Sequence, residues 1–170
     1  LILNQSGTFA GILETDGAIT FSQPGALGSG ILRLGGNLLL TADQALAGLR
    51  TLVSAVTIDT SSHTLSIDGP IEVAAGRTLA KAGGGRLEWS GDSSMFLGDL
   101  KILGGTLERR SSGDLIQGDL VTGGARLELS PSGSAGEIIQ IARETGTRYT
   151  NNGASSLVLD KGLAASLEVR

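Results

Sequence analysis

Asp99 and Asp119 are the two residues whose type and spacing come nearest to an acid–base pair. Each follows a glycine and precedes a leucine, and they lie one repeat of about 20 residues apart. Two carboxyl groups held side by side raise one another's pKa, act as general acid and base, or share a cation. An aspartate after a glycine is also a common turn residue, because its side chain hydrogen-bonds its own backbone. We favour the turn role for both.

A column of three glutamates, Glu88, Glu108 and Glu128, is the second candidate group. Carboxylate oxygens are the ligands that Ca²⁺ prefers, so stacked glutamates could hold this ion. Arg86 and Arg126 precede two of these glutamates by two residues and share their face of an extended strand. We therefore expect a solvated, salt-bridged outer face, with no metal and no cofactor.

His63 is the only histidine, and the chain contains no cysteine. A lone histidine supports neither a metal site nor a nucleophilic triad, so we expect a surface role for it. The single tryptophan and single tyrosine leave few aromatic platforms for sugar rings. Trp89 and Phe96 are expected to pack at a corner of the fold. We predict that the chain is not an enzyme and has no catalytic or cofactor-binding residues.

These side chains belong to a sequence repeat that must position them. GGRLEW at 84–89 returns as GGTLER at 104–109 and as GARLEL at 124–129, and SLEV at 166–169 is expected in the same register. A period of about 20 residues with short alternating strands and glycine turns is typical of a solenoid, in which each repeat forms one coil.

The repeat predicts a ladder of stacked residues. Strand alternation points its leucines inward and its glutamates outward, with a glycine opening each block. The ladder consists of Leu87, Leu107 and Leu127, of Glu88, Glu108 and Glu128, and of Gly84, Gly104 and Gly124. Arg148 is expected in the column between Glu128 and Glu168. Arg109 falls in an inward column, so we expect the strand to end at Glu108 or the register to slip there.

The rest of the chain consists of short strands between Gly, Ser, Asn and Asp-Gly turns. Residues 41–53 also fit a capped helix, although we favour a coil whose strand is 50–53. The fold class predicted is all-β: a right-handed single-stranded parallel β-helix, or β-solenoid, with about 20 residues per coil. No linker or shift in composition divides the chain, so residues 1–170 are expected to form a single domain.

The composition and net charge limit the kinds of partner that we expect the chain to bind. The 40% of hydrophobic residues with only 3% aromatics indicate a thin aliphatic core. A net charge of −4, with no basic cluster longer than 109–110, argues against nucleic acid. No run approaches the roughly 20 apolar residues needed to span a bilayer, so we expect no membrane insertion by this segment. The first residue is Leu1, and we expect the chain to be a segment of a larger secreted protein.

One stretch resembles the autotransporter-associated β-strand repeat. It reads KAGGGRLEWSG at 81–91 and, after MFLG at 95–98, LKILGGTL at 100–107. In that family a Lys-x-Gly-x-Gly-x-Leu-x-Leu-x-Gly block and a closing Gly-Thr-Leu build coils of a right-handed parallel β-helix. Here Trp89 replaces the second leucine, and the match covers residues 81–108. The resemblance implies a large bacterial protein that is extracellular or held at the outer-membrane surface.

We therefore expect a non-enzymatic structural or adhesive module of an autotransporter-like surface or secreted protein. Unpaired strand edges at both ends would let it assemble end to end into filaments. Its partners would be other copies of itself or neighbouring coils of the parent chain, together with host or surface glycans. The alternative is a carbohydrate-active β-helix, a polysaccharide lyase or phage tailspike-like protein, that uses Asp99 and Asp119. A third possibility is a passive segment that promotes export.

Overall fold

The computed structural model describes residues 1–4, 7 and 9–110, apart from the side chain of Arg109. Beyond residue 110 it describes the backbone of seven short strands. These are β15 (Gly113–Asp114), β16 (Leu120–Thr122), β17 (Arg126–Leu129), β18 (Ile138–Gln140), β19 (Tyr149–Asn151), β20 (Ser156–Leu159) and β21 (Ser166–Glu168).

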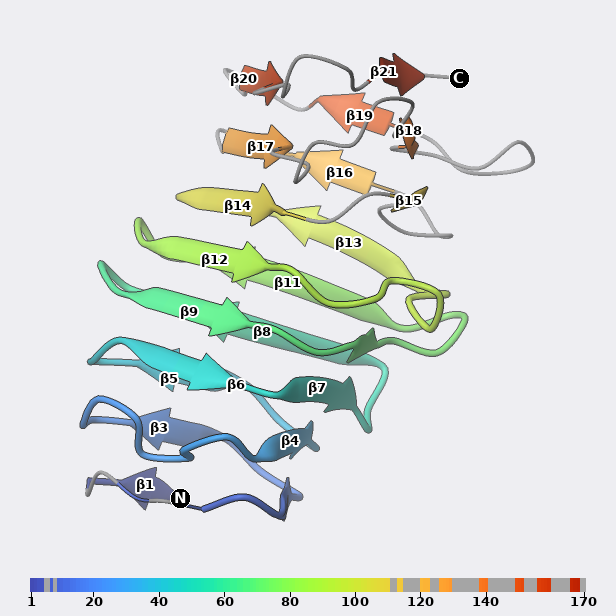
Figure 1. Cartoon of the computed structure of the whole chain (residues 1–170). Coiled ribbons are helices and arrows are strands. Elements are labelled where there is room, and N and C mark those ends of the chain that lie inside the picture. The colour runs from blue at the N-terminus through green and yellow to red at the C-terminus, as the bar shows by residue number, and fades with distance from the viewer. Residues whose placement is uncertain are drawn as a thin grey trace.

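The chain winds as a parallel β-solenoid whose successive turns rise from the N-terminus, as Figure 1 shows. Sheet A has eight strands and begins with β1 (Ile2–Leu3), β3 (Ile19–Phe21), β5 (Leu38–Leu40), β8 (Ala55–Asp59), β11 (Thr78–Ala82) and β13 (Asp99–Ile102), followed by β16 and β19. Sheet B contains β2 (Ile12–Thr15), β4 (Ile31–Leu34), β7 (Gly48–Thr51) and β10 (Ile71–Glu72). Sheet C contains β6 (Gln44–Leu46), β9 (Thr64–Ile67), β12 (Arg86–Trp89), β14 (Thr106–Arg109), β17 and β20.

Each strand stacks in parallel on the strand one coil earlier. Leu65 pairs with Leu87, and Leu87 pairs with Leu107, so the coils repeat at about 20 residues. Side chains alternate between the two faces of a strand, and in β12 the inward Leu87 and Trp89 are buried while Glu88 is half-buried. The predicted all-β solenoid, with coils of about 20 residues, is confirmed.

The core is a stack of aliphatic layers that also holds one pair of aromatic rings. Leu65, Leu87 and Leu107 lie one above another and are almost fully buried. Trp89 and Phe96 are buried beside them, with ring centroids 5.7 Å apart and planes tilted by 39°. The predicted packing of these two rings inside the fold is confirmed, since both are buried and in contact with each other.

Residues 41–53 form strands, so the helical alternative was wrong and the favoured coil was right. β6 and β7 lie slightly earlier than the predicted strand at 50–53. Both pair with strands of the neighbouring coils, and this long-range pairing outweighs the local helical spacing. Gln44 is buried at the lower edge of sheet C: its Nε2 donates to Gln23 O at 2.5 Å and its Oε1 accepts from Ala26 N at 3.0 Å. The amide thus closes an edge beyond which the described residues add no further strand to sheet C.

Two register predictions were wrong. Arg109 neither ends its strand nor shifts it, because its backbone pairs in register with Trp89 and Leu129. Glu128 pairs with Val158 in sheet C, whereas Glu168 lies opposite Gln140 in a short fourth sheet of β15, β18 and β21. The segment between β17 and β20 is longer than one repeat, so counting 20 residues along the sequence leads into another sheet. Arg148 lies outside the described residues.

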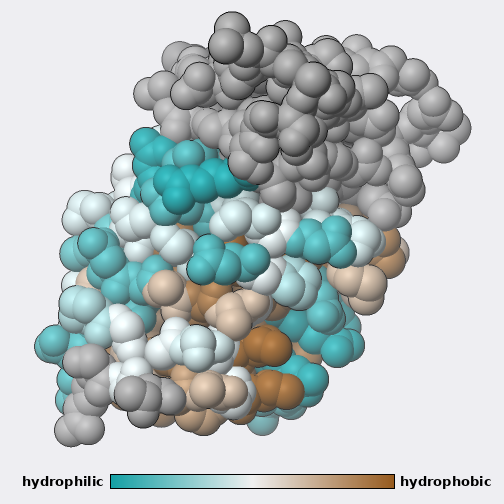
Figure 2. All heavy atoms as spheres, in the orientation of Figure 1, coloured by the Kyte–Doolittle hydropathy of each residue, from teal (hydrophilic) through white to brown (hydrophobic). Residues whose placement is uncertain are grey.

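The surface in Figure 2 is mostly hydrophilic over the described upper turns, and apolar residues gather on the lower, N-terminal turns. Leu1 and Ile2 are 61% and 68% exposed, and Phe9, Ile12 and Ile31 are also exposed. Nowhere in the described part of the chain is there a helix long and apolar enough to cross a membrane.

Candidate functional site

The two described glutamates of the predicted ladder lie on the outer face of sheet C, and its described leucines lie on the inner face. Glu88, Glu108 and Glu128 pair in register on β12, β14 and β17, and the corresponding leucines pair beside them. Leu87 and Leu107 point into the core, while Glu88 and Glu108 point to the opposite face. The side chains of Leu127 and Glu128, and all of Gly124, lie outside the described residues.

Arginines neutralise the two described glutamates. Arg86 Nη1 donates to Glu108 Oε2 at 2.6 Å, and Arg110 Nε donates to Glu108 Oε1 at 2.8 Å. Arg110 also reaches the coil below, where its Nη2 lies 2.9 Å from Glu88 Oε1, and Ser66 Oγ donates to Glu88 Oε2 at 2.8 Å. Every carboxylate oxygen of this pair therefore has a donor. Arg86 was expected on this face and Arg110 was not, although its position two residues after Glu108 signals the same face.

This network sets the electrostatics of the ladder. Hydrogen bonds from Arg110, reinforced by Arg86, hold the pKa of Glu108 below its ordinary value, although burial opposes the shift. The same contacts raise the pKa of Arg110. Since the carboxylates of Glu88 and Glu108 already bind guanidinium groups, these two described glutamates offer Ca²⁺ no free set of oxygens. The described residues include no group of three or more side chains able to hold a metal ion.

The turns that contain the ladder glycines Gly84 and Gly104 require glycine at some positions more strictly than at others. Gly83 and Gly105 adopt φ values of 77° and 63°, which side chains rarely tolerate. A methyl group on Gly105 would lie 2.2 Å from the carbonyl oxygen of Gly85. A methyl on Gly84 would meet nothing closer than 3.5 Å, and one on Gly104 would lie 3.2 Å from Gly83 O. Glycine is therefore strictly required at Gly83 and Gly105, next to the predicted positions Gly84 and Gly104.

A buried lysine sits beneath these turns. Lys81 is 0% exposed in β11, where it pairs with Ile58 and Ile102 at a core position. Its Nζ donates to the carbonyl oxygens of Ala82 at 2.9 Å, Gly83 at 3.0 Å and Gly104 at 3.0 Å. Burial lowers the pKa of Lys81 to about 8, although nearby Asp59 opposes this shift. Lys81, the first residue of the motif at 81–108, thus links two successive turns.

The outer face of sheet B carries a second charged column. Glu14, Arg33, Arg50 and Glu72 pair in register across four strands. Arg33 Nη1 lies 3.3 Å from Glu14 Oε2, and Arg50 Nε lies 3.5 Å from Glu72 Oε2. The order of charges along the solenoid is therefore negative, positive, positive, negative.

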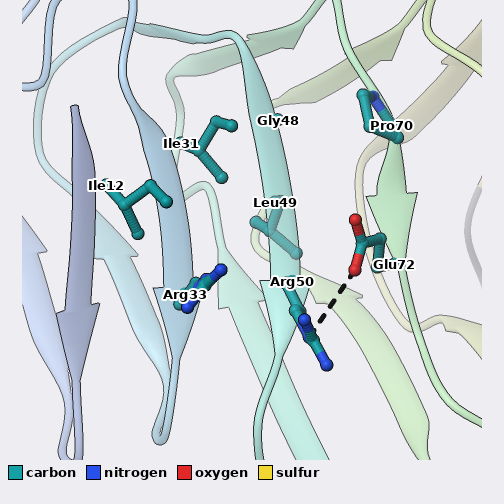
Figure 3. A pocket seen from close by; sticks show the side chains of 8 residues that line it. All are labelled: Ile12, Ile31, Arg33, Gly48, Leu49, Arg50, Pro70 and Glu72. Atoms are coloured by element: carbon teal, nitrogen blue, oxygen red, sulfur yellow. Dashed lines mark ion pairs between the residues drawn. The ribbon is translucent and has the colours of Figure 1, made fainter. Parts of the chain in front are cut away.

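Beside this column lies a hollow of about 70 Å³, drawn in Figure 3. Ile31 and Pro70 stand on either side of Gly48, with Arg33 and Arg50 at one end. Gly48 lies in register with Ile31, and its missing side chain creates the space. No pattern in the sequence indicated this feature, because its residues come from separate coils.

The other candidate residues are not assembled into a reaction centre in the described part of the chain. Asp99 begins β13 half-buried, opposite Thr78, and Asp119 lies outside the described residues. His63 is half-buried, with its Nδ1 3.5 Å from Oδ1 of Asp43, an oxygen that also accepts a hydrogen bond from the backbone N of Thr64. Asp43 therefore joins two coils at this turn.

No family model, curated protein or solved structure matches this chain. The resemblance to the autotransporter-associated β-strand repeat accordingly stands on the motif at residues 81–108. The structure adds a physical role to that motif, since its lysine and glycines form the hydrogen-bonded turns described above.

Proposed function

We propose that this chain is a non-enzymatic structural module, a stiff rod within an autotransporter-like surface or secreted bacterial protein. The observation that carries the proposal is that its ionic side chains link one coil to the next. Arg86 reaches Glu108, Arg33 reaches Glu14 and Arg50 reaches Glu72, each pair lying on stacked strands. The short, partly buried Arg86–Glu108 pair strengthens the contact between two coils, and the two exposed pairs add little to it.

The buried lysine supports the same role. Lys81 occupies a core position and satisfies carbonyl groups of two successive turns, which a neutral aliphatic residue could not do. Each coil of a solenoid contacts only its neighbours, so stiffness depends on the sum of such links from coil to coil. A stalk or presenting scaffold needs this property.

The extracellular location is part of the proposal and is supported by the motif at 81–108. The first strand also suggests how the rod continues. Ile2 on β1 and the preceding Leu1 are exposed, and β1 has a described strand partner on one side only, β3. A strand from a neighbouring coil of the parent chain or from another copy could pair there. Host or surface glycans remain proposed partners of an adhesive module.

Electron microscopy of the purified chain over a concentration series tests the rod and its assembly. We expect stiff rods that lengthen by end-to-end addition as concentration rises, and introduction of a charge by Ile2→Lys should prevent the lengthening. Globular particles would contradict the rod, and rods of one length at every concentration would contradict self-assembly.

The proposed extracellular location and the proposed lack of enzymatic activity need separate tests. An antibody against this chain should label intact cells of the source organism, and labelling only after permeabilisation would overturn the surface assignment. Incubation with a panel of acidic and neutral polysaccharides should release no product. Chain cleavage that is abolished by Asp99→Asn together with Asp119→Asn would instead establish the carbohydrate-active alternative.

A further inference from the structure

We propose that the hollow at Gly48 binds a small monocarboxylate that carries a short branched alkyl group. The site lies on the outer face of sheet B, away from the glutamate ladder, and goes beyond the structural role proposed above. It combines an apolar recess with two neighbouring cationic side chains, as Figure 3 shows.

The recess is shaped for an alkyl group. Its sides are formed by Ile31 and Pro70, and Leu49 lies behind the strand at its floor. Ile12 and Ile31, which stack in register, are 52% and 38% exposed, so apolar surface at this place meets water. A volume of about 70 Å³ is about twice the roughly 30 Å³ that one water molecule occupies in the liquid, so the recess takes up one or two methyl groups of a branched alkyl chain.

The arginines supply the charge complementarity. Arg33 and Arg50 face each other directly across β4 and β7, and like charges in this relationship repel. Arg33 contacts Glu14 through Nη1, and Arg50 contacts Glu72 through Nε. Each guanidinium has five N–H donors, so both retain donors for a further oxygen.

Of the two flanking glutamates, Glu72 also lines the hollow, where its carboxylate contacts Arg50, and Glu14 does not line it. Glu14 and Glu72 lie on the outer two strands, and their side chains are 52% and 35% exposed. Exposed pairs at 3.3 and 3.5 Å are weakly held. A ligand carboxylate between Arg33 and Arg50 would make the charges along this column alternate in sign. Two guanidinium groups present planar donor sets suited to carboxylate oxygens.

The two parts of the site select one ligand class. A carboxylate alone leaves the recess empty, and an alkyl group alone leaves the arginines without a shared acceptor. Isovalerate carries both groups in the required size and serves as the probe. Acetate lacks the branched alkyl group and isoamyl alcohol lacks the charge, so these compounds are matched controls.

The test is a titration of the full 170-residue chain, followed by amide NMR shifts at constant ionic strength. Isovalerate should produce saturable shifts at Gly48, Leu49 and Arg50 with half-saturation at roughly 1–10 mM, as expected for so small a ligand. Acetate and isoamyl alcohol should bind at least about tenfold more weakly. Equal responses to acetate and isovalerate, or no saturation with isovalerate up to about 50 mM, would overturn the proposal.

Variants separate the site from a general charge effect. Arg50→Gln and Arg33→Gln should each weaken isovalerate binding by about tenfold, because each removes one guanidinium. Lys101→Gln removes an exposed cation from sheet A and should leave half-saturation unchanged. Gly48→Ala should fill the recess and abolish the preference for isovalerate over acetate. If Gly48→Ala does not fold, the two arginine variants decide the matter, and unchanged half-saturation in both would refute the site.

Discussion

Lys81 Nζ donates a hydrogen bond to the carbonyl oxygen of Gly104 at 3.0 Å, across 23 residues of sequence. The same ammonium group binds the carbonyl oxygen of Gly83 in its own turn, so one buried cation holds two stacked turns at their separation. Charged side chains are rare in the core of a solenoid. The ammonium group of Lys81 is tolerated there because three carbonyl oxygens accept its hydrogen bonds.

Replacement of Lys81 tests whether its hydrogen bonds to the two turns, here called the lysine clamp, stabilise the fold. Lys81→Met should lower the free energy of unfolding by about 2–4 kcal/mol, because the carbonyl groups of Gly83 and Gly104 lose their donor inside the protein. Urea denaturation followed by circular dichroism measures the change. Lys101→Met, on an exposed position of β13, is the control and should shift stability by less than about 0.5 kcal/mol. Equal effects of the two variants would show that the clamp contributes nothing.

Stability should also depend on pH through Lys81. Its pKa is about 8 in the folded chain, against 10.5 for a fully solvated lysine. Below pH 8 both folded and unfolded chains hold the proton; between pH 8 and 10.5 the unfolded chain holds it preferentially, so stability rises with pH and levels off above 10.5. The unfolding free energy of the wild type minus that of Lys81→Met should therefore grow by up to about 3 kcal/mol. A difference that stays flat over this range would contradict the lowered pKa.

The glutamate ladder has its own test. Glu108→Gln should lower the free energy of unfolding by about 1–2 kcal/mol at neutral pH, because Arg86 and Arg110 lose their charged acceptor. Since the pKa of Glu108 is lowered in the folded chain, its contribution exists above pH 4.5 and is lost as the pH falls through the folded value. Wild type and variant should therefore converge on acidification. Glu14→Gln, in an exposed pair, should cost less than about 0.5 kcal/mol.

Two neighbouring turns should respond to an added methyl group with very different losses of stability. Gly105→Ala should destabilise by at least about 2 kcal/mol, because the residue has a positive φ and its new methyl would meet the backbone of Gly85. Gly84→Ala, with no close contact, should change stability by less than about 0.5 kcal/mol. Thermal melting of both variants measures the contrast. A larger loss for Gly84→Ala than for Gly105→Ala would contradict the described turn.

A pair of buried threonines gives a final comparison. Thr51 and Thr60 are 1% and 0% exposed; Thr60 Oγ1 donates to Ala82 O at 3.1 Å, whereas Thr51 Oγ1 has no hydrogen-bond partner among the described residues. Thr51→Val should therefore stabilise the chain by about 1 kcal/mol, and Thr60→Val should destabilise it by a similar amount. Chemical denaturation distinguishes the two signs. A loss of stability in Thr51→Val would indicate that its hydroxyl group has a polar partner.

Much of the fold could be predicted because it depends on local rules. The alternation of Leu87 with Glu88, and of Leu107 with Glu108, determines which side faces the core. Repeated glycines mark the turns and set the coil length near 20 residues, which pairing in sheet C confirms. The same alternation places Lys81 inward beside Leu79, a signal that was present in the sequence but that the prediction of a purely aliphatic core overlooked.

The candidate sites could be predicted only in part. Glu108 and Arg86 were placed on one face from spacing alone, whereas the hollow at Gly48 requires residues of separate coils to meet. A side chain that is absent from one coil creates a recess only when the coils above and below supply its walls. No pattern within a single repeat contains that information.

By itself, then, the sequence determined an all-β stack of short strands, the inward leucines and the outward glutamates, because side-chain alternation acts within each strand. Only the tertiary structure decided which strands meet. Leu127 pairs with Leu157 rather than with a residue 20 positions later, and Glu168 stands in a different sheet. Pairing partners are chosen by backbone hydrogen bonds between coils, and connecting segments can lengthen without disturbing them, so register beyond an irregular coil cannot be counted along the chain.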